Sequence, residues 1–86
     1  MNEPDIPTAP QVSRDTFGKR DCEIVVAASA SRDAAVAWAL FVRPDGRLDP
    51  IYDERGVLVR ECAGTTAGAN AAVRQRLIAL LGARRL

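Results

Sequence analysis

Carboxylates are the only common catalytic groups that this chain holds in number. Its 86 residues include eleven Asp and Glu, two cysteines and no histidine. Without histidine the chain lacks the usual general base near neutral pH and the commonest metal ligand. Most of its carboxylates, such as Asp45 and Glu54, fall at expected turns, where acidic side chains are normally solvated. The sequence therefore predicts no enzyme, and no catalytic, metal or cofactor site.

The two cysteines give no sign of metal or redox chemistry. Cys22 and Cys62 lie far apart in the sequence and form no CxxC pattern. We expect reduced, partly buried thiols. In a meander sheet the two cysteines would be neighbours if their strands paired, and the sequence leaves this open.

Basic residues collect in the last quarter of the chain. Residues 64–86 contain four arginines and no acid, whereas residues 1–63 contain more acids than bases. Two interpretations stay open: these arginines complement the negative end of a helix dipole, or they contact a few phosphates of a nucleic acid. The net charge of +1 predicts at most weak nucleic-acid binding.

Two apolar stretches predict the centre of a sheet. Residues 23–30 form a continuous apolar run of strand length, which is typical of a strand buried on both sides. In residues 35–42, bulky side chains alternate with three alanines and Phe41, which predicts a strand with one bulky face and one mostly methyl-sized face. The residues Pro44-Asp45-Gly46 directly after it predict a hairpin.

The second half of the chain predicts one weak strand, one further strand and a helix. Pro50 confines residues 48–53 to a sheet edge, and a turn at residues 54–56 leads to a strand at residues 57–62. Thr65 or Thr66 is a suitable N-cap for a helix that runs to about Leu81, with Gly82 at its end. The core stripe of this helix is expected to comprise Ala69, Val73, Leu77 and Leu80.

These elements predict a small α+β domain. We expect a three- to four-stranded, mainly antiparallel meander sheet with one C-terminal helix packed on one face. Because three prolines punctuate its start, we interpret residues 1–20 as a flexible N-terminal tail and residues 21–86 as the single domain. One helix covers one side of a sheet, so the other side of an apolar central strand is expected to associate with a partner.

Several segments together resemble the first half of the ribonuclease H fold. These are residues 25–29, residues 37–42, and residues 64–66 opening a helix that ends with residues 78–81. Catalytic members of that family hold two magnesium ions with several carboxylates. Here Ala27 or Ala28 stands at the first aspartate position, and residues 67–81 contain no acid. The resemblance, over residues 22–81, implies a shortened relic fold without nuclease chemistry. A fainter likeness to double-stranded-RNA-binding domains lacks the basic helix start of that family.

The leading functional hypothesis is a non-enzymatic protein-binding module, such as a small regulator or inhibitor of the kind that phages or mobile elements encode. It would act through an open sheet face or a strand edge, on a protein partner or as a homodimer. The alternative is a weak nucleic-acid-binding domain that uses the C-terminal arginines. The sequence predicts a cytoplasmic protein with no membrane span, no cofactor and no small-molecule substrate. The residues proposed to contact a partner are Phe41, Arg74, Arg76, Ile78, Arg84 and Arg85.

Overall fold

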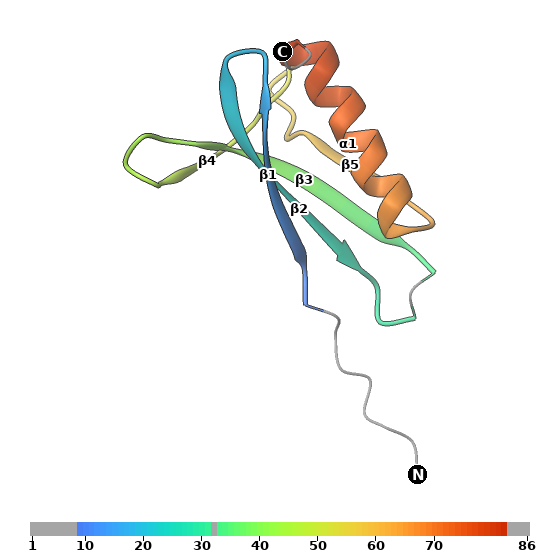
Figure 1. The fold of residues 1–86 in the computed structure, drawn as a ribbon. Helices are drawn as coiled ribbons and strands as arrows, with labels where there is room; N and C mark the ends of the chain where they lie inside the picture. The colour runs from blue at the N-terminus through green and yellow to red at the C-terminus, as the bar shows by residue number, and fades with distance from the viewer. Residues whose placement is uncertain (1–8, 32, 83–86) are drawn as a thin grey trace.

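The computed structural model describes residues 9–31 and 33–82, which form one antiparallel sheet and one helix. The sheet has five strands, and β1 to β4 follow one another across it in sequence order. The helix, α1, lies along one side of the sheet, and the described residues place no second layer on the other side (Figure 1). The predicted α+β class, with an antiparallel meander and a C-terminal helix, is confirmed.

The first strand begins inside the segment that the sequence interpretation assigned to a flexible tail. Strand β1, Gln11–Phe17, pairs along its whole length with β2. The assignment of residues 11–17 to a tail was therefore wrong. The prolines that suggested a tail all precede this strand, whereas Phe17 is 4% exposed and anchors the strand in the core. The first eight residues of the predicted tail lie outside the described part of the chain.

Strands β2, Arg20–Ala28, and β3, Ala35–Val42, form the centre of the sheet. They pair with each other from Cys22 opposite Phe41 to Ala28 opposite Ala35. Strand β2 lies between β1 and β3, so it has a hydrogen-bonded neighbour on both edges. This confirms the central position that its apolar run predicted.

The outer edge of β3 is shared by two short strands. Strand β4, Leu48–Pro50, pairs with one end of β3, and β5, Arg60–Ala63, pairs with the other end. The predicted hairpin turn is present, because the Gly46 amide donates to the Arg43 carbonyl oxygen. The last strand begins later than predicted, at Arg60. Of the predicted strand residues 57–59, Leu58 forms only an isolated bridge with Tyr52.

The strand pairing also separates the two cysteines. Cys22 lies opposite Phe41 at one end of β3, and Cys62 lies opposite Val36 at the other end. Both are free thiols; Cys22 is buried and Cys62 is exposed. The two residues are therefore not neighbours, because β5 pairs with β3 and not with β2.

Helix α1, Thr66–Leu81, begins and ends at the residues that the sequence indicates. The Thr65 hydroxyl oxygen accepts a hydrogen bond from the Gly68 amide at 3.0 Å, which satisfies one of the free donors of the first turn. Gly82 adopts a positive φ of 97°, and its amide donates to the Ile78 carbonyl oxygen. The helix buries Ala69, Val73 and Leu77 against the sheet.

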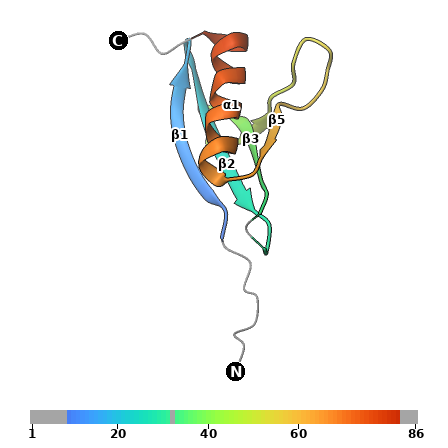
Figure 2. The ribbon, with the colours of Figure 1, turned by 90° about the vertical axis from the view of Figure 1, so that its right-hand side faces the viewer.

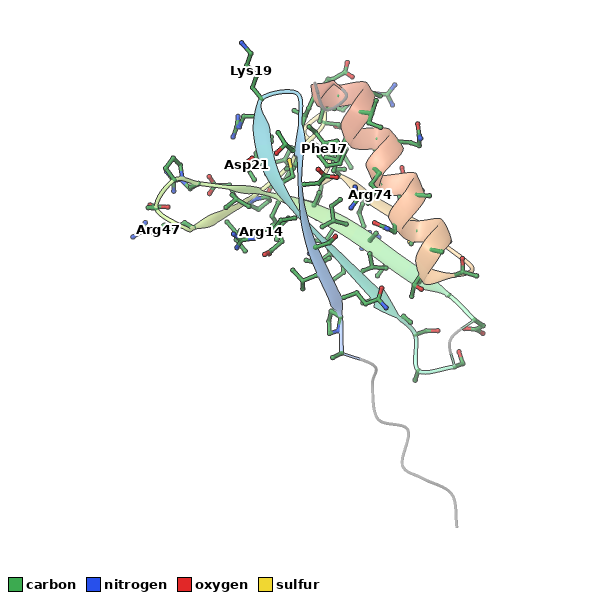
Figure 3. All side chains as sticks on the ribbon, in the orientation of Figure 1. Arg14, Phe17, Lys19, Asp21, Arg47 and Arg74 are labelled. Atoms are coloured by element: carbon green, nitrogen blue, oxygen red, sulfur yellow. The ribbon has the colours of Figure 1, made fainter. Side chains whose placement is uncertain are left out.

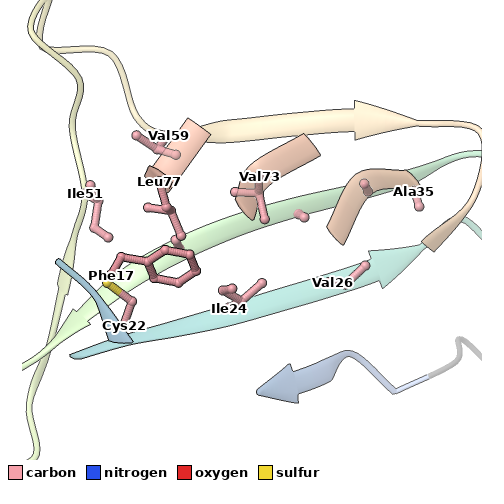
Figure 4. Close-up of a cluster of buried hydrophobic side chains, with 12 residues drawn as sticks. Phe17, Cys22, Ile24, Val26, Ala35, Ile51, Val59, Val73 and Leu77 are labelled. Carbon is pink, nitrogen blue, oxygen red and sulfur yellow. The ribbon is translucent and has the colours of Figure 1, made fainter. Parts of the chain in front are cut away.

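The core lies between α1 and the sheet (Figures 2 and 4). Ile24 of β2 and Leu77 of α1 are fully buried there, together with Ile51 and Val59 from the segments that flank the turn at residues 54–56. The core has no buried polar side chain among the described residues. The contact that joins α1 to this side of the sheet is therefore apolar at its centre.

The β1–β2 turn touches the end of α1. Gly18 has a φ of +59°, and a Cβ atom built on it would lie 2.2 Å from the Leu81 carbonyl oxygen. Only a residue without a side chain allows this approach, so Gly18 fixes the end of the helix against the turn.

We expect Gly18→Ala to destabilise the fold by about 3 kcal/mol, because it adds a backbone clash to the strain of a positive φ. Gly46→Ala is the matched control, since Gly46 also has a positive φ, of +87°, but no atom lies within 4 Å of a Cβ placed there. The control should lose about 1 kcal/mol. Urea unfolding of both variants measures the difference, and equal losses would show that the helix end does not rest on this turn.

Candidate functional site

The surface of the sheet turned away from α1 is named here the open face. Side chains alternate along each strand, so the neighbours of the buried residues Ile24 and Ala39 point to this side. The strand registers place fifteen side chains on it: Val12, Arg14 and Thr16 of β1; Asp21, Glu23, Val25 and Ala27 of β2; Val36, Trp38, Leu40 and Val42 of β3; Leu48 and Pro50 of β4; Arg60 and Cys62 of β5.

Strand β3 turns three alanines and Phe41 to the helix side and Val36, Trp38, Leu40 and Val42 to the open face. Ala35, Ala37 and Ala39 are at most 5% exposed beneath α1. Such small residues let the helix approach the sheet closely, so that its own Val73 and Leu77 fill the space between the layers. The consequence is that the larger residues of β3, including Trp38, are left outside the core that α1 covers.

The open face is apolar over its middle. Val25 is only 8% exposed although no helix covers it, because it lies between Val12 and Trp38 on the neighbouring strands. Val12 itself is 58% exposed and Leu48 is 40% exposed. A connected apolar surface of this kind on a small domain marks an interaction site more often than a solvated surface does.

Charged side chains on the open face are few and balanced. Arg14 pairs with Glu23 across β1 and β2, with 3.3 Å between Nε and Oε1. Asp21 accepts a hydrogen bond from the Thr16 hydroxyl at 2.9 Å. Arg60 forms no ion pair with any described residue. Figure 3 shows Arg14 and Asp21 on the side of the sheet away from α1. The strands thus place two arginines and two carboxylates on this surface, so their charges sum to zero.

Two shallow hollows border the apolar area. One, of about 290 Å³, is lined almost entirely by small apolar residues at the far end of β2 and β3, with Cys62 at its side. The other, of about 320 Å³, lies among Arg14, Thr16, Asp21 and their neighbours at the opposite end. In the second hollow the Thr16 hydroxyl donates to the Asp21 carboxylate, but this hydrogen bond lies at the exposed surface, where a carboxylate is solvated. Both hollows are better suited to receive side chains of a partner than to perform chemistry.

The structure places two of the proposed contact residues in ion pairs within the chain. Arg74 Nη1 lies 2.8 Å from Asp15 Oδ2 of β1. Arg76 reaches the opposite margin of the sheet, 2.9 Å from Glu61 and 3.2 Å from Asp53. The two arginines therefore connect α1 to two opposite margins of the sheet. The carboxylates there largely neutralise the charge of both arginines.

The other proposed contact residues do not gather into one site either. Ile78 is 38% exposed on the outer side of α1, as predicted. Phe41 lies on the helix side of the sheet, where it packs against the core beneath the guanidinium of Arg20, 3.9 Å from its ring centroid. Arg84 and Arg85 lie outside the described residues. The four proposed residues that the structure describes thus belong to different surfaces.

Trp38, Val36 and Leu40 are the candidate contact residues that the sequence interpretation did not select. The signal was present in the alternation of residues 35–42, where every second side chain is bulky. The sequence interpretation did not decide which face of this strand the helix covers. The deciding fact is that the helix packs on alanines, which only the three-dimensional arrangement reveals.

Comparisons with protein-family models, with curated proteins and with solved structures find no match for this chain. Among the described residues no helix is long and apolar enough to cross a membrane. The same part of the chain contains no group of three or more His, Cys, Asp or Glu residues placed to hold a metal ion.

The two thiols are expected to differ sharply in reactivity. Burial raises the pKa of Cys22 to about 11, although the charge of nearby Arg20 opposes part of that rise. At pH 8 this residue is therefore a buried neutral thiol, whereas Cys62 is exposed. Dilute folded protein should react rapidly with one equivalent of a thiol reagent, and unfolding should release the second. In Cys62→Ser the rapid phase should vanish; two rapid equivalents in the wild type would contradict this placement of Cys22.

Proposed function

We propose that this chain is a protein-binding module and that its open face is the binding surface. The observation that carries the proposal is the outward position of Val36, Trp38, Leu40 and Val42, while the alanines of the same strand are buried under the helix. Aromatic and aliphatic side chains gathered at the centre of a surface are the usual anchors of protein interfaces. The chain would act by occupying a surface of its partner, as a small regulator or inhibitor does.

The outer edge of β1 is a second route to the same function. Gln11–Phe17 pairs with β2 on one side, and no described strand pairs with its other side. Its free backbone groups are able to add a strand of a partner. Since Arg14 and Asp15 place charges on this strand, and charges discourage edge pairing, we favour the face over the edge.

The structure offers less support for nucleic-acid binding of ribonuclease H-like ancestry. Arg74 and Arg76 each pair with carboxylates of the sheet, so binding a phosphate would require breaking or sharing those pairs. The open face itself is uncharged overall. We therefore do not put nucleic-acid binding forward as the function.

Capture from a lysate of the source cells tests the proposal. Tagged wild type should retain a protein in stoichiometric amount, and Trp38→Glu should lose it, because a charge at the centre of the face must be desolvated on binding. Ile78→Glu is the matched control, since it places the same charge on an exposed apolar residue of the helix.

The control should bind as the wild type does. Circular dichroism must show that both variants are folded. If Trp38→Glu retains the same protein as the wild type, or if the folded wild type retains none, the open face is not a binding surface for another protein.

A further inference from the structure

We infer that the protein bound by the open face is a second copy of this chain, packed face to face about a two-fold axis. This inference rests on the proposed function and names the partner. It places the two β3 strands against each other, antiparallel, with the axis passing between Trp38 and Leu40.

The side-chain sizes along β3 favour this arrangement. The outward residues of β3 read Val36, Trp38, Leu40, Val42, with small residues at the ends and large residues in the middle. A two-fold axis at the centre of this row sets Trp38 against Leu40 of the other copy and Val36 against Val42 of the other copy. Each contact occurs twice, as a two-fold interface requires. The row is therefore complementary to itself.

The charges of the open face point to the same partner. Arg14 and Arg60 balance Asp21 and Glu23, so the surface does not select a strongly acidic or strongly basic partner. Arg14 lies on the edge strand β1, but its partner Glu23 lies on β2 directly opposite Leu40, and Arg60 of β5 lies opposite Trp38. The row on β3 is itself uncharged and has one charge of each sign beside it. An uncharged row with flanking charges of both signs suits a copy of itself better than a partner of strong single-sign charge, because the charges of the face sum to zero.

The size of the face is sufficient for a specific dimer. Across the sheet there are four strand positions about 4.8 Å apart, and along each strand about four outward side chains follow one another at about 6.8 Å. The projected area of the open face is therefore about 500 Å². Two copies therefore bury about 1,000 Å² or more of accessible surface in total, since side chains stand out of the plane. This is the size at which specific interfaces begin, and it predicts a dimer that dissociates on dilution.

Molar mass in solution, measured over a wide range of concentration, is the first test. The wild type and Ile78→Glu should show the same monomer–dimer equilibrium. Trp38→Glu and Leu40→Lys should each weaken it about a hundredfold, because each removes a central anchor and buries a charge.

Mixing the two weakened variants tests the register of the interface. In a mixed dimer, the carboxylate introduced at position 38 of one copy would oppose the ammonium group introduced at position 40 of the other. The second central contact keeps its native Trp38 and Leu40. The mixture of Trp38→Glu with Leu40→Lys should therefore form dimers at concentrations where each variant alone is monomeric. This rescue does not depend on whether either single variant is somewhat less stable.

The outcomes separate the two proposals. A wild type that is monomeric at millimolar concentration overturns the second-copy inference. It leaves the proposed function standing, which the capture experiment tests separately. A dimer that persists in both single variants, or a mixture that remains monomeric while each variant is folded, also overturns the inference. Concentration-dependent dimers that the central charges abolish and the mixture restores support it.

Discussion

The close packing of α1 on the alanines of β3 is the constraint on which the rest of the structure depends. A single helix covers one side of a sheet, and here it covers the side where Ala35, Ala37 and Ala39 let it approach. Val73 and Leu77, which α1 buries, contribute about 1.5–3 kcal/mol each when they leave water. Because the same strand alternates strictly, closing the helix on the alanines turns Trp38 and its bulky neighbours outward.

The polar contacts of α1 orient the helix and contribute less to its stability. Partly exposed ion pairs such as Arg74–Asp15 and Arg76–Glu61 contribute about 0–1 kcal/mol each. They reach opposite margins of the sheet and so resist rotation of the helix about its axis. Arg74 and Arg76, which in sequence resemble part of a basic binding patch, therefore have a structural use.

Local signals in the sequence predict most of the elements. The caps at Thr65 and Gly82, the hairpin at residues 43–47 and the apolar run of β2 each depend on neighbouring residues, and the structure confirms them. Strand β1 was missed because prolines at residues 4, 7 and 10 were extended in interpretation to a segment that contains none. Whether Phe41 or Trp38 lies under the helix depends on which face of the sheet the helix covers. This is decided by tertiary packing, which no short sequence pattern encodes.

Trp38 is the only tryptophan of the chain, so its fluorescence reports directly on the open face. If a second copy covers this face, emission at high protein concentration should be that of a buried indole and should shift to longer wavelength on dilution. Far-ultraviolet circular dichroism should remain constant over the same range, because the fold of each copy does not change. An emission maximum that is the same at every concentration, with the indole fully accessible to a water-soluble quencher, would contradict the account.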